Sequence, residues 1–157
     1  MCITCSVIEG KKTLPGGLLY KDDRIIIHHC IDVNVPGYLV ISPIRHVTGY
    51  QELTDAELMA MAKGIKIMVS ILHKLPDVEK VYILNLGEET SHFHFHIFPR
   101  YRWMIDKSNV ALFSAEKLDG AKLFSYYRNR NKTSELETIP EINKMIAFIK
   151  SQLQCMQ

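Results

Sequence analysis

A run of alternating histidines and apolar residues in the middle of the chain restricts its fold more than any other feature. Residues 91–100 read SHFHFHIFPR. Successive side chains of a β-strand point to opposite faces, so His92, His94 and His96 are predicted to share one face. The apolar residues between them would pack into a core, and that apolar face fixes the register. We therefore predict a strand over 92–98, ended by the proline that follows.

Turn residues and apolar periodicity divide the remaining sequence into short strands and helices. Strands are predicted at 18–20, 24–30, 38–42 and 81–86. A capping box at Thr54 and Glu57 begins a helix that Pro76 ends. Two further helices are predicted near 115–124 and, amphipathic, over 140–153. The pattern is that of an α+β fold with an antiparallel sheet, followed by a helical addition.

Composition excludes several classes of protein. The chain has 157 residues, of which 47% are hydrophobic, enough for one domain with a substantial core. Its 19 basic and 17 acidic residues argue against a nucleic-acid or membrane-surface binder. No apolar stretch approaches the ~20 residues of a membrane span, and no signal peptide pattern is evident. We expect a cytoplasmic protein that uses its cysteines as thiols or metal ligands.

Three imidazoles on one side of a strand suit metal binding, proton transfer or nucleophilic attack. Neighbours on one face of a strand lie ~6.6 Å apart. Three such residues therefore converge poorly on one zinc ion, whose nitrogen ligands lie ~2.1 Å away. The spacing disfavours a site made of the three histidines alone.

The run resembles the histidine triad (HIT) motif, His-φ-His-φ-His-φ-φ with φ apolar. Three other segments resemble the same family: CITC at 2–5, LYKDD at 19–23, and GYLVISP at 37–43 with His46 after it. The resemblance implies a HIT-like fold with a five-stranded antiparallel sheet, one long and one short helix. It covers residues 1–102 as a domain core, with 103–157 as a C-terminal helical extension packed on the same domain.

The resemblance also implies an enzyme that acts on the α-phosphate of a nucleotide. His94 would be the nucleophile and form a covalent nucleotidyl-histidine that water hydrolyses. His96 would contact a phosphate oxygen and protonate the leaving group. Diadenosine polyphosphates or nucleoside phosphoramidates are the implied substrates, and either hydrolysis or nucleotidyl transfer fits. The alternative is a nucleotide-binding or interaction module without turnover, which would have no need of a nucleophile.

Family members are usually homodimers, so a homodimer is expected. Apolar residues on the long helix would either form such an interface or pack on the chain's own sheet. They are Met59, Met61, Ile65 and Met68.

Cys2-x-x-Cys5 has the spacing of metal ligands but supplies only half of a site. Resemblance to the zinc-containing, diadenosine polyphosphate hydrolase-like branch implies that His46 and His92 complete it. Such a Cys₂His₂ set is closed, so the zinc would be structural rather than catalytic. The alternative is that both cysteines are ordinary thiols and that His92 holds the tautomer of its neighbour.

The loop before the triad departs from the family pattern. Many members have a glycine-rich loop with a glutamine and a serine there, whereas residues 85–91 are shorter and carry two glutamates. These carboxylates are expected to point away from a bound phosphate. Asn85, Thr90 and Ser91 are the candidate substrate contacts, Asn85 being equally consistent with a polar residue at a strand end.

Three other positions depart from the pattern or extend it. In the family pattern, a carboxylate or amide side chain holds the ribose, and that position is Cys30 here. Cysteine cannot make this contact. Asp32 is the candidate substitute, and the alternative is that Asp32 is a solvated loop residue. The family's second loop histidine is Tyr38 here. Arg100 follows the triad and either steers phosphates or lies on the surface.

Overall fold

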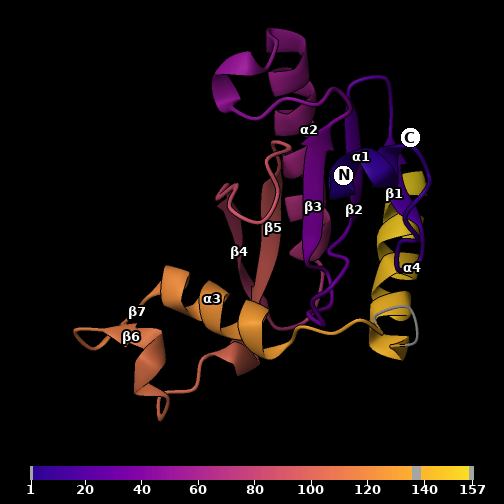
Figure 1. Cartoon of the computed structure of the whole chain (residues 1–157). Helices are drawn as coiled ribbons and strands as arrows, with labels where there is room; N and C mark the ends of the chain where they lie inside the picture. The colour runs from indigo at the N-terminus through magenta and orange to yellow at the C-terminus, as the bar shows by residue number, and fades with distance from the viewer. Residues whose placement is uncertain (1, 136–138, 156–157) are drawn as a thin grey trace.

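The computed structural model describes residues 2–135 and 139–155, and its centre is one antiparallel sheet (Figure 1). The strand order is β1-β2-β3-β5-β4. The strands are β1 (Leu18–Lys21), β2 (Ile25–His29), β3 (Leu39–Pro43), β4 (Val78–Leu84) and β5 (Phe95–Tyr101). The predicted α+β class with five antiparallel strands is confirmed.

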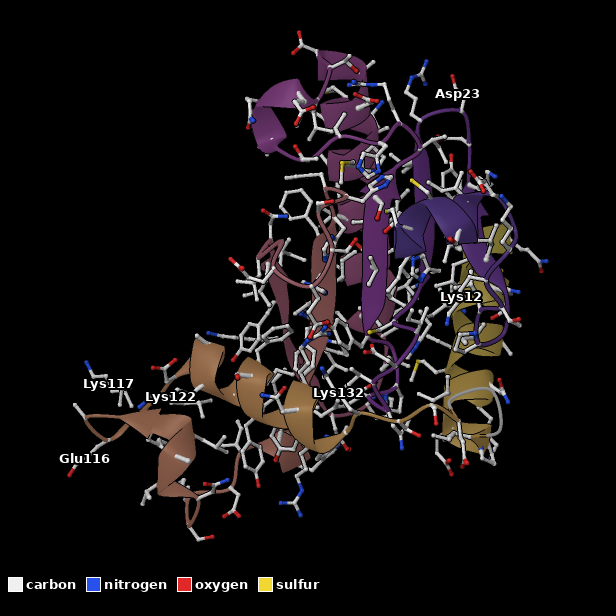
Figure 2. The ribbon with its side chains drawn as sticks, in the orientation of Figure 1. Lys12, Asp23, Glu116, Lys117, Lys122 and Lys132 are labelled. Atoms are coloured by element: carbon white, nitrogen blue, oxygen red, sulfur yellow. The ribbon has the colours of Figure 1, made fainter. Side chains whose placement is uncertain are left out.

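In the described residues, four α-helices accompany the sheet, and a small hairpin lies apart from it. The helices are α1 (Ile3–Ile8), α2 (Asp55–Leu72), α3 (Gly120–Arg130) and α4 (Pro140–Gln154). The hairpin pairs β6 (Phe113–Ser114) with β7 (Lys117–Leu118). It lies on an arm away from the sheet, where Figure 2 shows the charged side chains of Glu116, Lys117 and Lys122.

Alternation along the strands gives the sheet two different faces. On one face Ile27, Ile41 and Ile97 pack with α2 and with the buried isoleucines of α4. Helix α2 approaches this face closely, because a Cβ on Gly64 would lie 2.9 Å from a methyl group of Ile41. The opposite face carries His28 and His96, and it is covered by α1 and α3 around a cavity. Both faces of the sheet are therefore used, one for stability and one for a site.

The fifth strand begins later and ends later than predicted. His92 and His94 precede β5, and Pro99 lies within it rather than ending it. Pairing between β3 and β5 stops at Ile97, so Pro99 has a strand partner only in β4. A proline fits such a stretch because it cannot donate to a second ladder.

Two helices differ from the sequence prediction. The helix near 115–124 was placed too early, because residues 113–118 form the small hairpin and Asp119 caps α3 from Gly120. The short helix α1 was not predicted, since six residues carry too little periodicity to mark it. The capping box of α2 is present, with Thr54 and Glu57 bonded to each other's backbone.

Two of the apolar residues named on α2 face the chain's own sheet, and one faces solvent. Met61 and Met68 are each 1% exposed, whereas Met59 is 58% exposed. The structure thus favours the intramolecular alternative for the two buried methionines. Homodimer formation stays a prediction.

The pairing of Glu57 with Arg45 predicts a pH-dependent contribution to stability. Arg45, with help from Thr54, lowers the pKa of Glu57 from its ordinary 4.5 to about 2. A carboxylate whose pKa falls on folding stabilises the fold above its unfolded pKa, and loses that effect as the pH drops toward the folded value. Glu57→Gln should cost roughly 1.5–3 kcal/mol at pH 7, the range for hydrogen bonds to a charged group.

Urea unfolding of wild type and Glu57→Gln from pH 7 to pH 2.5 measures this difference, which should shrink below pH 4.5. Asp55→Asn is the matched control, because it removes an exposed carboxylate from the same helical turn. A difference that stays constant over this range would contradict the assignment.

Candidate active site and metal centre

Two imidazoles of the alternating run meet at the start of β5. The Nε2 atoms of His94 and His96 lie 3.1 Å apart, with the two rings nearly perpendicular. Their side chains are 6% and 7% exposed, contrary to a histidine face open to solvent. Helices α1 and α3 cover this face. The sequence of the strand alone does not indicate this cover. The imidazoles therefore lie in a largely enclosed site.

Backbone contacts hold the His94 ring in one orientation. Its Nδ1 lies 2.8 Å from the carbonyl oxygen of His92, which can only accept a hydrogen bond. The Nδ1 atom therefore carries the proton, and Nε2 keeps its lone pair. The Asn85 side-chain amide donates to the His94 carbonyl at 2.7 Å and holds the backbone of the same residue.

Burial keeps both imidazoles uncharged. It lowers the pKa of His94, and it lowers the pKa of His96 to about 3, with His94 and Arg128 contributing in the same direction. A neutral imidazole has one bare nitrogen, which is what a nucleophile or a hydrogen-bond acceptor needs. At neutral pH the pair can supply one attacking nitrogen and one N–H donor.

The pair opens onto a cavity of about 360 Å³. Its walls come from α1, β2, the loop after β4 and α3, so segments far apart in the chain enclose it. Apolar side chains such as Val7, Val40 and Phe124 form much of the lining. A mainly apolar pocket with a few polar groups at one end suits a small organic ligand.

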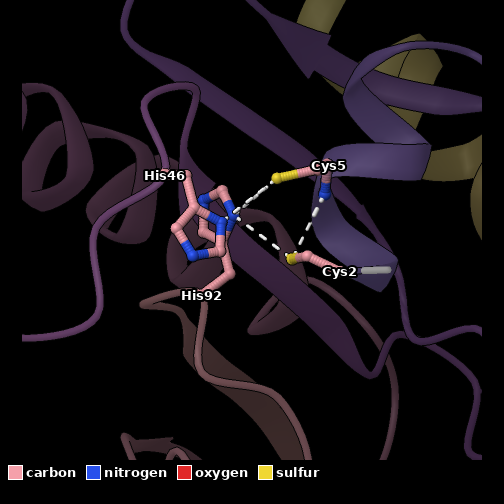
Figure 3. A group of neighbouring side chains, drawn as sticks. All are labelled: Cys2, Cys5, His46 and His92. Carbon is pink, nitrogen blue, oxygen red and sulfur yellow. Dashed lines mark hydrogen bonds between the residues drawn. The ribbon is translucent and has the colours of Figure 1, made fainter.

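A second cluster lies beside the triad segment, where α1 meets the β3–α2 loop (Figure 3). One ligand atom from each of Cys2, Cys5, His46 and His92 lies within 4.8 Å of every other. The sulfur of Cys5 is 3.2 Å from Nδ1 of His46 and 3.6 Å from Nδ1 of His92. Tetrahedral zinc with Zn–S of 2.3 Å and Zn–N of 2.1 Å would place such atoms roughly 3.6 Å apart.

The orientation of His92 fits this cluster. Its Nε2 lies 2.9 Å from the Pro43 carbonyl oxygen and therefore carries the proton. Its Nδ1 then presents a lone pair to the sulfurs of Cys2 and Cys5, each 3.6 Å away. Two sulfurs and two imidazoles complete a tetrahedral set without a free position, so the residues fit a structural zinc.

Comparison with known families agrees with this geometry. Residues 11–103 match the family model described as the HIT domain. The chain belongs to the HIT family. This family includes nucleotide hydrolases and transferases.

This HIT protein is similar to several individual proteins in sequence or in fold. A HIT-like protein of Methanocaldococcus jannaschii is 34% identical over 106 residues, which are 64% of this chain and 80% of that one. The asymmetrical bis(5'-nucleosyl)-tetraphosphatase of Schizosaccharomyces pombe is 24% identical over 103 residues, covering 62% and 56%. A zinc-bound histidine triad family protein from Mycobacterium smegmatis shares the fold, with a TM-score of 0.67, 14% identity and coverage of 99% and 97%.

The HIT cavity brings together some of the predicted substrate contacts but not all. Asp32 and Thr90 line it, and so does Cys30, at the position that the family pattern gives to the ribose ligand. Ser91 is exposed and lies outside the lining. Arg100 lies farther along β5, also outside the lining, where it donates to Glu79 at 2.9 Å.

The glutamates before the triad do not point away as expected. Glu88 and Glu89 both line the cavity. Glu89 is paired with Arg128 and with Lys132, the latter at 3.1 Å (Figure 2 labels Lys132). These two cations balance the Glu89 carboxylate, which reduces its repulsion of a bound phosphate.

Three residues at or beside the cavity were missed as site residues: His28 and Arg128 line it, and Tyr38 lies behind His96. His28 faces His94 from β2, with its Nδ1 bonded to the His29 carbonyl. Tyr38 lies 2.8 Å from Nδ1 of His96, and Arg128 donates to the Tyr38 hydroxyl at 2.8 Å. Residues 128–132, RNRNK, form a basic run at the end of α3 that is visible in the sequence, but nothing local indicated that its first member reaches Tyr38 beside the triad. None of the helices in the described part of the chain could span a membrane.

Proposed function

We propose that this HIT protein is a nucleotide hydrolase or nucleotidyl transferase that acts on an α-phosphate. Diadenosine polyphosphates and nucleoside phosphoramidates are the proposed substrate classes. The observation that carries the proposal is the bare Nε2 of His94, buried at the wall of the cavity with its other nitrogen bonded to a carbonyl. Similarity to a bis(5'-nucleosyl)-tetraphosphatase supports the same chemistry.

In the first step the lone pair on Nε2 of His94 attacks the α-phosphorus. A P–N bond forms while the bond from phosphorus to the leaving oxygen breaks, and that oxygen departs with the electron pair. The Nε2–H group of His96 donates a hydrogen bond to it. The nucleotidyl ring of His94 keeps its Nδ1 proton, and its positive charge faces the His92 carbonyl.

In the second step water attacks the same phosphorus. The P–N bond breaks, its electron pair returns to Nε2 of His94, and the water proton passes to solvent. With a phosphoramidate, the leaving nitrogen accepts the hydrogen bond from His96 and takes its proton from solvent, so His96 stays neutral. An acceptor other than water at this point makes the same protein a transferase.

Substrate contacts follow from the cavity lining. The Asp32 carboxylate is proposed to accept hydrogen bonds from ribose hydroxyls, and the Thr90 hydroxyl to donate to phosphate. Asn85 acts through the backbone of His94 rather than on substrate. Ser91 and Arg100 are proposed only as more distant contacts for the leaving portion of the substrate.

The cluster of Cys2, Cys5, His46 and His92 is proposed to bind one structural zinc ion. The ion would fix the N-terminal helix and the triad segment relative to each other, because ligands come from both. The ion would only hold these residues in place and would not bind substrate, since four protein ligands leave no free coordination position.

Replacing the nucleophile tests the proposed reaction. His94→Ala should lower kcat by about 10³-fold or more, as removal of a covalent nucleophile does in other enzymes. The measurement is release of nucleoside monophosphate from a panel of dinucleoside polyphosphates and nucleoside phosphoramidates. Mass spectrometry of quenched wild-type reactions should also detect a nucleoside monophosphate adduct on His94.

His73→Ala is the matched control, because His73 is an exposed histidine at the end of α2. It should leave turnover unchanged. Tight nucleotide binding without turnover by wild type would instead favour the binding-module alternative.

Metal analysis tests the proposed zinc. Freshly purified protein should contain one zinc ion per chain, and Cys5→Ser should lose it and unfold at a lower temperature, since metal binding contributes to folding. Cys155→Ser is the matched control, because Cys155 is an exposed thiol outside the cluster. Near-zero zinc in unchelated wild type, or full zinc in Cys5→Ser, would contradict the assignment.

A further inference from the structure

We infer that Arg128 and Tyr38 are positioning residues that fix which ring nitrogen of His96 carries its proton. The inference deepens the proposed function, on which its catalytic consequence rests. It makes α3 part of the machinery that prepares the leaving-group donor. Arg128 lies outside residues 11–103, the part of the chain that matches the HIT domain model.

The direction of each hydrogen bond follows from the guanidinium. An arginine side chain can only donate, so the Tyr38 oxygen accepts from Nη1 of Arg128 at 2.8 Å. The Tyr38 hydroxyl hydrogen is then available to the other neighbour of that oxygen, Nδ1 of His96, at 2.8 Å. A nitrogen that accepts this hydrogen bond is unprotonated, so the His96 proton is on Nε2.

The other end of the chain of hydrogen bonds requires the same result. The His92 carbonyl places the His94 proton on Nδ1, so Nε2 of His94 is bare. It lies 3.1 Å from Nε2 of His96. One of these two nitrogens has to donate, and only His96 can. The opposite His96 tautomer would set two lone pairs against each other and leave the Tyr38 hydroxyl facing an N–H.

Packing keeps Tyr38 in this role. Its side chain is fully buried, and its ring contacts Phe98 and Phe124 edge-on, with centroids 5.2 and 6.1 Å away. Burial raises the pKa of Tyr38, so the hydroxyl keeps its hydrogen. Arg128 is held in turn by Glu89 from the loop before the triad.

The arrangement has a consequence for the reaction. When a nucleotide fills the cavity, the leaving oxygen takes the place of Nε2 of His94 as acceptor for His96. The donor is then already oriented, and no proton has to move before the bond to phosphorus breaks. The effect should be largest when the leaving group is poor, because more negative charge then develops on the leaving oxygen.

Substitutions along this series of hydrogen bonds test the inference. Tyr38→Phe and Arg128→Gln remove the two hydrogen bonds, and Arg128→Lys keeps the charge and one donor. The matched controls are Tyr126→Phe and Arg130→Gln, because Arg130 donates to Tyr126 at 2.8 Å on the same helix but outside the cavity. Circular dichroism and thermal unfolding establish that each variant is folded.

The first readout is the tautomer itself. In wild-type protein labelled with ¹⁵N-histidine, the ring nitrogens of His96 should show a protonated Nε2 and a bare Nδ1. Tyr38→Phe and Arg128→Gln should shift the Nδ1 signal or mix the two tautomers, and both controls should leave it unchanged. A protonated Nδ1 in wild type would overturn the inference. This measurement needs no turnover, so it decides the inference even if the proposed reaction fails.

The second readout is kinetic and uses the phenyl and p-nitrophenyl esters of adenosine monophosphate. Tyr38→Phe and Arg128→Gln should lower kcat roughly three- to tenfold for the phenyl ester, the effect of losing one neutral hydrogen bond. The change for the p-nitrophenyl ester should be under about twofold, because this better leaving group depends less on a donor. Arg128→Lys should recover part of the loss.

Two kinetic outcomes would overturn the inference. Equal losses with both esters would indicate a general structural effect. A rise in KM at constant kcat would make Arg128 a direct ligand of the substrate phosphate.

Discussion

The position of His92 is the constraint on which both sites depend. Its backbone carbonyl accepts from Nδ1 of His94 at 2.8 Å and so leaves Nε2 of that ring bare. Its ring donates to the Pro43 carbonyl and turns Nδ1 toward the two cysteines of α1. One residue thus joins the cysteine–histidine cluster to the proposed nucleophile, His94. Any shift of this segment would disturb the cluster geometry and the His94 tautomer together.

The sheet separates the stability of the protein from its chemistry. The face under α2 and α4 is closed by aliphatic side chains, with Gly64 letting the helix come close. The opposite face holds a cavity, and α1 and α3 supply part of its walls. Buried imidazoles on that face remain neutral, and each proton is placed by a partner of fixed direction. The chemistry depends on this enclosure, since exposed histidines would exchange protons with water and lose these fixed roles.

Sequence periodicity was sufficient for most of the fold and for the proposed reactive pair. Alternation identified His94 and His96, and the capping box located α2 correctly. Sequence periodicity did not predict features that depend on contact with another helix or strand. Pro99 continues β5 because β3 has already ended beside it, and α1 is too short to carry a period. Arg128 was part of a basic run with no local signal of its contact, because Tyr38 is 90 residues away in sequence.

By itself, the sequence determined the residues that can carry the chemistry and the strand pattern that displays them. Period-two alternation and cysteine spacing are local properties, so they can be identified without a fold. Tertiary structure decided how those residues meet: the 3.1 Å approach of His94 to His96, the donor that reaches Tyr38 from α3, and the gathering of Cys2 and Cys5 with His46 and His92. Hydrogen bonds and metal coordination act over about 3 Å. Contacts of that length between distant residues exist only after the sheet and its covering helices have assembled.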